Sequence, residues 1–168
     1  MSDINLSTVS PDAKALAEFM QATLDAVVAV YESYSMPTPE RRYWTLGDPA
    51  IDCEQLVVSF VQAYLGSPGD EAMYPRRCND PRSATIHVSV SRKAPSIGNS
   101  GKAPAADVIQ DYAEICAYDA WCLLASAGEL DVWGINAGVG LGVIATVETL
   151  SPEGGYQTTV MTFTAAIP

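Results

Sequence analysis

Apolar side chains recur along the chain with two spacings, and the first of these predicts a helix near the N-terminus. Ser10-Pro11-Asp12 is a helix-start signal, with a capping serine, a first-turn proline and a carboxylate near the positive helix end. Apolar residues then follow every three or four positions, at Leu16, Phe19, Met20, Leu24, Val27 and Tyr31. Acidic residues lie on the opposite side, at Glu18, Asp25 and Glu32. The pattern predicts an amphipathic helix from about Pro11 to Tyr34, before Pro37.

A second stretch with helical spacing runs from about Pro104 to Ala127 and is predicted to stop at Gly128. Its apolar stripe consists of Val108, Ile109, Tyr112, Ile115, Cys116 and Leu123. A polar stripe on another side consists of Asp107, Asp111 and Glu114. We expect the apolar stripe to face the core and the acidic stripe to face solvent.

The other spacing is strict alternation, which predicts strands. It is clearest from Ala84 to Lys93, where Ile86, Val88 and Val90 are predicted to point inward and Thr85, His87, Ser89 and Ser91 outward. Further strands are predicted at Arg41–Leu46, Glu54–Tyr64, Val139–Leu150 and Tyr156–Ile167, the last two forming a hairpin. This order predicts an α+β fold, with an antiparallel or mixed sheet of four to five strands and two helices packed on one face.

The length fits one domain, residues 1–168, with residues 1–10 as an N-terminal arm and long loops at Gly66–Pro81 and Ala94–Ala103. Twenty acidic residues against nine basic ones give a net charge of −11. This excess argues against general nucleic-acid binding and against binding to anionic membranes. We find no signal peptide and no apolar run long enough to span a bilayer, so we expect synthesis in the cytoplasm.

Candidate catalytic and binding motifs are incomplete. Ile97–Ala103 lies where a phosphate-binding loop would lie, but Ser96 replaces the first glycine and Ala103 the magnesium-binding hydroxyl. The glycines at Gly138–Gly142 open a predicted strand, whereas a dinucleotide fingerprint opens a helix. His87 is the only histidine, and no Cys/His cluster suggests a metal site. We therefore expect no cofactor, no metal and no enzymatic activity.

The four cysteines are too few for a disulfide scaffold. Cys53 and Cys78 flank a strand and a loop, so the two could meet in space. Buried free thiols are the simpler interpretation.

A candidate subunit interface lies on the acid-bearing side of the second helix. Tyr118 and Trp121 project there beside Asp111 and Glu114, and aromatic residues on a polar face are typical of protein interfaces. Basic residues gather in loops and at edges: Arg41, Arg42, Arg76, Arg77, Arg82, Arg92, Lys93 and Lys102. An acidic helix face and basic loops suit a head-to-tail contact that closes into a ring, with Arg76, Arg77 and Arg82 as the basic partners. A scattered charge distribution is the alternative.

Several stretches resemble one family. These are Arg42–Gly47, Asp52–Val58, Arg77-Cys78 leading to Pro81–Ala84, and Gly142–Val147 with the closing strand to Pro168. They resemble small tail and neck proteins of long-tailed phages that infect actinobacteria, over nearly the whole chain beyond about Pro11. The order of elements looks like that of the tail terminator family.

The resemblance implies a structural virion protein made in the host cytoplasm. It would form a homo-oligomeric, hexameric ring that caps the tail tube protein and joins it to the head–tail connector or stopper protein. DNA would pass through the lumen without specific binding, which an acidic wall suits. Alternatives are another head–tail connector, such as a stopper or tail-completion protein, or a small-molecule-binding α+β domain.

Overall fold

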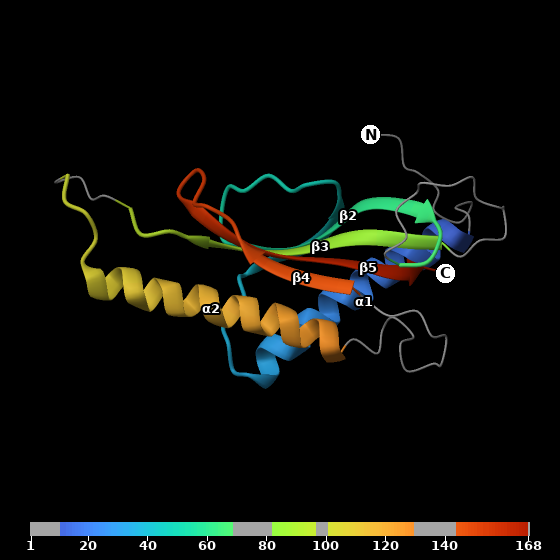
Figure 1. Ribbon diagram of the computed structural model, residues 1–168, viewed down its shortest axis with the longest axis horizontal. Coiled ribbons are helices and arrows are strands. Elements are labelled where there is room, and N and C mark those ends of the chain that lie inside the picture. Colours follow the sequence, from blue (N-terminus) through green and yellow to red (C-terminus); the bar gives the residue numbers. More distant parts are fainter. Residues whose placement is uncertain (1–10, 69–81, 97–100, 130–143, 168) are drawn as a thin grey trace.

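The computed structural model describes residues 11–68, 82–96, 101–129 and 144–167, which form a five-stranded sheet with two helices on one face (Figure 1). In chain order the elements are α1 (Pro11–Ser33), β1 (Arg41–Leu46), β2 (Gln55–Leu65), β3 (Arg82–Lys93), α2 (Ala106–Glu129), β4 (Ile144–Thr149) and β5 (Tyr156–Ile167). The strands lie in the order β1-β2-β3-β5-β4. β1 runs parallel to β2, and the other neighbours are antiparallel, so the sheet is mixed. The predicted α+β class is confirmed.

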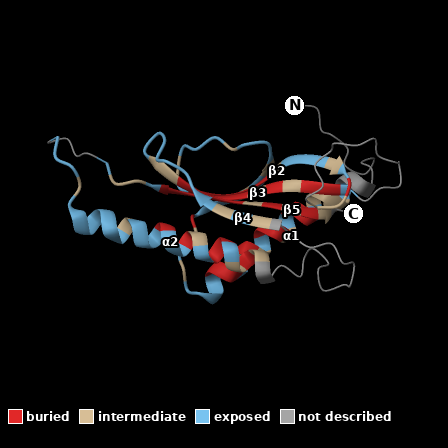
Figure 2. Cartoon of the chain, viewed as in Figure 1, coloured by how far each residue is buried: buried red, intermediate tan, exposed pale blue. Residues whose placement is uncertain are grey.

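The core lies between the helices and the sheet, with α1 beneath β1 and β2 and α2 beneath β5 and β4. The predicted inward positions of β3 are confirmed, because Ile86, Val88 and Val90 are fully buried (Figure 2). They meet Met20 and Val27 of α1 in one apolar cluster. Alternation along the strand thus determines which side chains are buried. The burial of apolar side chains is the main source of the fold's stability.

A buried ion pair joins the end of β3 to the middle of α2. The guanidinium of Arg92 donates hydrogen bonds from Nε and Nη2 to the two carboxylate oxygens of Asp119, each at 2.9 Å. The Tyr31 hydroxyl of α1 donates to the same carboxylate at 3.0 Å, and Arg92 also donates to the carbonyl of Pro37. One network therefore fixes both helices relative to the sheet.

The prediction that Arg92 lies with the basic residues of loops and edges is wrong, because it is buried on β3, an inner strand of the sheet. Its side chain is 9% exposed, and that of Asp119 is 1% exposed. Arg92 occupies the next inward position of β3 after Val90, so the alternation that buries the valine also buries the arginine. Burial opposes the charge of Arg92, but the hydrogen bonds and charge of Asp119 raise its pKa above the ordinary value.

The opposite face of the sheet is partly covered by the 47–54 loop between β1 and β2, which arches over the strands in Figure 1. Gln55 donates from its side-chain amide to the carbonyl of Ala50 at 2.8 Å. The Tyr156 hydroxyl of β5 donates to the carbonyl of Asp52 at 3.1 Å. These bonds hold the loop close to the sheet. Val57 and Ser59 are fully buried on this face.

Three boundaries of the predicted helices shift, and one of these is the start of α2, which lies at Ala106 and not at Pro104. α1 ends at Ser33, one residue before the prediction, and α2 continues through Gly128 to Glu129. A glycine weakens a helix interior by only about 1 kcal/mol, which is too little to end a helix that is packed on a sheet. For the predicted strand Val139–Leu150, the structure has β4 at Ile144–Thr149, and residues 139–143 lie outside the described residues.

The apolar stripe predicted for α2 is only partly buried. Cys116 and Leu123 are buried, but Val108, Ile109 and Ile115 are exposed. For Val108 and Ile109, Figure 1 shows the reason, because the first turns of α2 extend past the end of the sheet, and Figure 2 shows these turns exposed. Ile115 lines a groove between α2 and the segment from Pro37 to Arg41. Helical spacing identifies the apolar side of a helix, but burial also requires strands beneath it.

Candidate functional site

The outer face of α2, defined here as Tyr118, Trp121 and Leu124, carries large apolar side chains into solvent. They are 47%, 58% and 48% exposed. Three-residue spacing on a helix places them along one side, away from the buried Leu123. The predicted exposure of Tyr118 and Trp121 is confirmed, while their role in a subunit interface stays a prediction.

The acidic residues predicted beside this surface are also exposed. Asp111 and Glu114 both lie on α2 with solvent-accessible side chains, and the Tyr118 hydroxyl donates to the Glu114 carboxylate at 3.3 Å. This bond holds the tyrosine ring along the helix surface. The resulting surface combines aromatic side chains, which are enriched at the centre of interfaces, with carboxylates, which are commoner at their polar rim.

A groove of about 700 Å³ lies on the other side of the first half of α2. Ile115 and Tyr112 form one wall, and the segment from Pro37 to Arg41 forms another. The Tyr112 hydroxyl donates to the carbonyl of Arg92 at 3.1 Å, which fixes that wall to β3. Apolar side chains of α2 are therefore accessible at two positions, in the groove beside its first half and on the outer face in its second half.

The basic half of the predicted contact is only partly described. Arg76 and Arg77 lie outside the described residues, and Arg82 begins β3 with an exposed side chain. Arg41 pairs with Asp52 within the same subunit. Together with the burial of Arg92, this leaves fewer of the predicted basic residues for a contact with the acidic helix.

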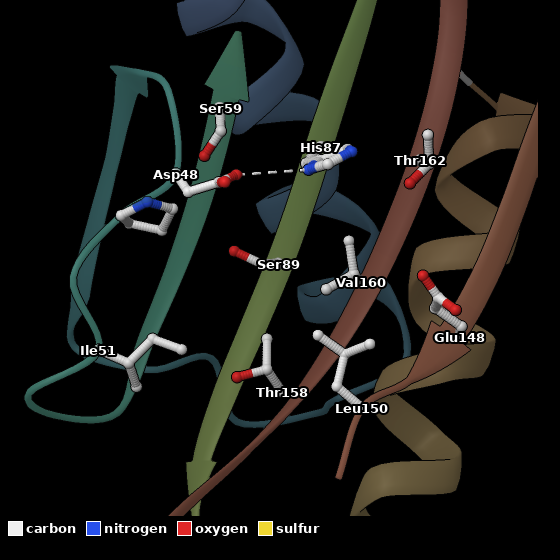
Figure 3. A pocket seen from close by; sticks show the side chains of 11 residues that line it. Asp48, Ile51, Ser59, His87, Ser89, Glu148, Leu150, Thr158, Val160 and Thr162 are labelled. Carbon is white, nitrogen blue, oxygen red and sulfur yellow. Dashed lines mark ion pairs between the residues drawn. The ribbon is translucent and has the colours of Figure 1, made fainter. Parts of the chain in front are cut away.

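A second candidate site is a pocket of about 300 Å³ on the sheet face opposite the helices, here called the sheet pocket (Figure 3). The 47–54 loop forms one wall with Pro49 and Ile51, and Leu150 and Val160 form an apolar wall on the side of β4 and β5. Four hydroxyl side chains also line the pocket, those of Ser59, Ser89, Thr158 and Thr162. Small ligands usually bind in apolar pockets that carry a few polar groups.

The hydroxyl of Ser59 is buried in the sheet pocket without a hydrogen-bond partner. Leaving a buried hydroxyl unsatisfied costs about 1–3 kcal/mol, and native folds contain few such groups. The alternation along β2 places Ser59 on the face opposite Leu56 and Val58. That alternation could have shown the face of Ser59, but not that a loop would cover it.

His87 lies next to Ser59 on the neighbouring strand, and its Nδ1 is 3.8 Å from the Asp48 carboxylate (Figure 3). The structure thus brings a serine, a histidine and an aspartate into one pocket, which the sequence did not indicate. They form no hydrogen-bonded relay, because the Ser59 hydroxyl has no partner and the separation of His87 and Asp48 exceeds a hydrogen bond. The arrangement therefore does not activate Ser59 as a nucleophile.

The remaining sequence motifs add no site within the described residues. Residues 97–100, residues 138–142 and Cys78 lie outside them. Burial raises the pKa of the Cys116 and Cys122 thiols, which lowers their reactivity as nucleophiles. In the part of the chain that the structure describes, no group of three metal-ligating side chains occurs, and no helix has the length and apolar character of a membrane span.

A scan against protein-family models finds no match to this chain, and a search of curated proteins finds none.

Proposed function

We propose that this protein is a tail terminator subunit of a long-tailed phage, which forms a ring that caps the tail tube and joins it to the head connector. The observation that carries the proposal is the exposed apolar surface of α2. Six large apolar side chains of this helix are exposed, namely Val108, Ile109, Ile115, Tyr118, Trp121 and Leu124. So much apolar surface on one helix is typical of a protein that assembles.

Each subunit of a closed ring uses two different surfaces, one for each neighbour. The outer face of α2 offers one of them, with Tyr118 and Trp121 as anchors of the residue types that most often dominate binding energy. The groove offers a second surface at a different position, where Ile115 and Tyr112 lie beside charged residues such as Glu40 and Lys93. Two separate surfaces of different composition on one subunit favour a ring over a pair of subunits related by a twofold axis.

The order of elements and the charge support the same assignment. The chain runs helix, three strands, helix and two strands, which is the order expected from the resemblance to tail terminators. A net charge of −11 suits a ring whose lumen passes DNA without holding it, because an acidic wall repels phosphates. On this proposal the protein is a structural component of the virion with no catalytic role.

Two alternatives remain as hypotheses. Within the same class, the chain would be another head–tail connector, such as a stopper or tail-completion protein, which uses the same kind of interface. From a different class, a small-molecule-binding domain is favoured by the sheet pocket and its unsatisfied Ser59 hydroxyl.

The test is the double substitution Tyr118→Ala with Trp121→Ala. We expect a folded, soluble subunit that no longer forms rings or binds tail tubes, because each truncated anchor removes about 2 kcal/mol or more from every interface. Analytical ultracentrifugation and electron microscopy would measure assembly, and circular dichroism melts would measure folding.

Tyr34→Ala is the matched control, since Tyr34 is as exposed as Tyr118, at 47%, but lies just after α1. Rings should form normally in this variant. Normal rings in the double variant would place the interface elsewhere, and failure of the wild-type protein to assemble with purified tail tubes or head connectors would reject the proposal. Binding to tubes would favour a terminator, whereas binding to connectors alone would favour a stopper.

A further inference from the structure

The sheet pocket is a built site whose chemistry differs from that of the α2 surface. Its floor holds the fully buried Ser59 hydroxyl, which has no hydrogen-bond partner. Figure 3 shows Ser59, Asp48 and His87 gathered at one end of the pocket and Glu148 at the other. A ligand that reaches the floor would satisfy a polar group that the fold leaves unsatisfied.

The charged side chains that line the pocket indicate the sign of the ligand's charge. The exposed carboxylates of Asp48, from the 47–54 loop, and Glu148, from β4, both line it, and no lysine or arginine does so among the described residues. His87, 3.8 Å from Asp48, carries a positive charge only when it is protonated. Two carboxylates and a net charge of −11 repel an anion and attract a cation. An ammonium group has three donors and no acceptor, so it suits both carboxylates and the acceptor lone pairs of Ser59.

The walls and the volume of the pocket indicate the chemical character and the size of the uncharged part of the ligand. Ile51 and Leu150 face the pocket from the loop and from the end of β4, and neither wall presents a Phe, Tyr or Trp ring among the described lining residues. An aliphatic chain therefore fits better than a sugar or a planar base, which usually stacks on an aromatic ring. A volume of about 300 Å³ holds the equivalent of roughly ten water molecules, so the part of the ligand inside the pocket has about ten non-hydrogen atoms or fewer.

We propose that the sheet pocket binds an aliphatic ammonium group, with its charged end at Asp48 and Ser59 and its chain along Ile51 and Leu150. Glu148, at the far end, would bind a second ammonium on a diamine. The same chemistry has two possible sources, a free aliphatic diamine or the lysine side chain of a partner protein. This site is separate from the outer face of α2, so it does not depend on ring formation.

The experiment titrates the whole chain with 1,5-diaminopentane and with a lysine blocked at both backbone ends, by calorimetry at low salt. We expect saturable binding of one or both, and at least tenfold weaker binding of the neutral 1,5-pentanediol. Diamine binding alone identifies a free amine as the source, and blocked-lysine binding alone identifies a protein side chain. Binding of neither overturns the proposal, as does equal binding of the diol.

The variants Ser59→Ala, Asp48→Asn and Glu148→Gln locate the site. Ser59→Ala should weaken binding about tenfold, since a hydrogen bond to a charged group is lost, while the variant melts at the same or a higher temperature. Asp48→Asn should weaken binding of either amine, and Glu148→Gln should weaken only the diamine. Glu153→Gln, which removes an exposed carboxylate beyond the pocket, is the control and should bind like the wild type.

Two results would overturn the site. Equal weakening by Glu153→Gln and Asp48→Asn would mean that the net negative charge attracts amines without a specific pocket. A melting temperature lowered by several degrees in Ser59→Ala would mean that the hydroxyl has a structural partner in the folded protein.

Discussion

The two helices lie on the same face of the sheet and have nearly the same length, 23 residues in α1 and 24 in α2, yet they use their apolar residues differently. α1 buries its stripe in the core, at Phe19, Met20, Leu24, Val27, Val30 and Tyr31. Within its described side chains α1 exposes no large apolar residue, whereas α2 exposes six. α1 lies beneath β1 and β2, while the first turns of α2 extend past the strands (Figure 1).

This difference separates folding from assembly. The apolar residues of α1 stabilise the subunit, because nearly all of them are removed from water when the chain folds. Those of α2 form two groups, a buried one that includes Leu123 and an exposed one that includes Trp121. Substitutions in α1 and on the buried side of α2 should therefore change the free energy of unfolding, and those on the exposed side should change only association.

The largest expected effect comes from the residue that joins the two helices. Asp119→Ala removes the counter-charge of the buried Arg92 and the acceptor of the Tyr31 hydroxyl. Breaking one partner of a buried pair costs about 3–5 kcal/mol, because the other charge stays buried without compensation. Urea denaturation would measure the loss.

The control for that substitution is Asp111→Ala, which removes an exposed acid from the same helix and should change stability by no more than about 0.5 kcal/mol. Equal effects of the two substitutions would mean that Arg92 reaches water in solution.

Two adjacent leucines sharpen the contrast within α2. Leu123 is fully buried and Leu124 is exposed, so Leu123→Ala should cost about 2–5 kcal/mol and Leu124→Ala less than about 0.5 kcal/mol. Ile115→Ala should resemble Leu124→Ala, although helical spacing alone predicts the opposite. Thermal melts of the three variants would check this order. A large loss for Leu124→Ala would show that the outer face of α2 is covered within the subunit.

The smallest expected effect concerns α1 at alkaline pH. Burial, followed by the charge of Asp119, raises the pKa of Tyr31 far above its ordinary value of 10.0. Above about pH 10 the unfolded chain releases this proton and the native state keeps it, so stability falls as the pH rises. One such group lowers the free energy of unfolding by up to about 1.4 kcal/mol for each pH unit above pH 10.

Tyr31→Phe should cost about 1 kcal/mol at neutral pH through the lost hydrogen bond, and it should make the alkaline decline shallower. The decline should not vanish, since burial also raises the pKa of Tyr112, Cys116 and Cys122. Denaturation curves between pH 8 and pH 11 would test this. An unchanged alkaline slope would contradict the burial of the Tyr31 hydroxyl.

The candidate sites were predictable to different degrees. Tyr118 and Trp121 could be placed on the exposed side of α2 because a side chain's direction around a helix follows from its position in the sequence. The sheet pocket could not be predicted, since it needs Asp48 from a loop and Glu148 from a strand far along the chain. The pairing of Arg92 with Asp119 could have been suspected from the sequence. Arg92 follows Val90 at an inward position of its strand, and Asp119 lies between Cys116 and Leu123 on the apolar side of its helix, so both charges stand at positions where the pattern indicates burial.

The sequence by itself determined the types of the elements, their order and the inward side of β3, because these depend on residue spacing over a few positions. Tertiary structure alone decided how far the sheet extends beneath α2, which charges pair in the interior, and that the 47–54 loop covers Ser59. Burial depends on what lies over a side chain, and the covering residues come from distant parts of the sequence. Ile115 shows the distinction, because its spacing is that of a core residue, yet its side chain lines the groove beside α2 and stays 40% exposed.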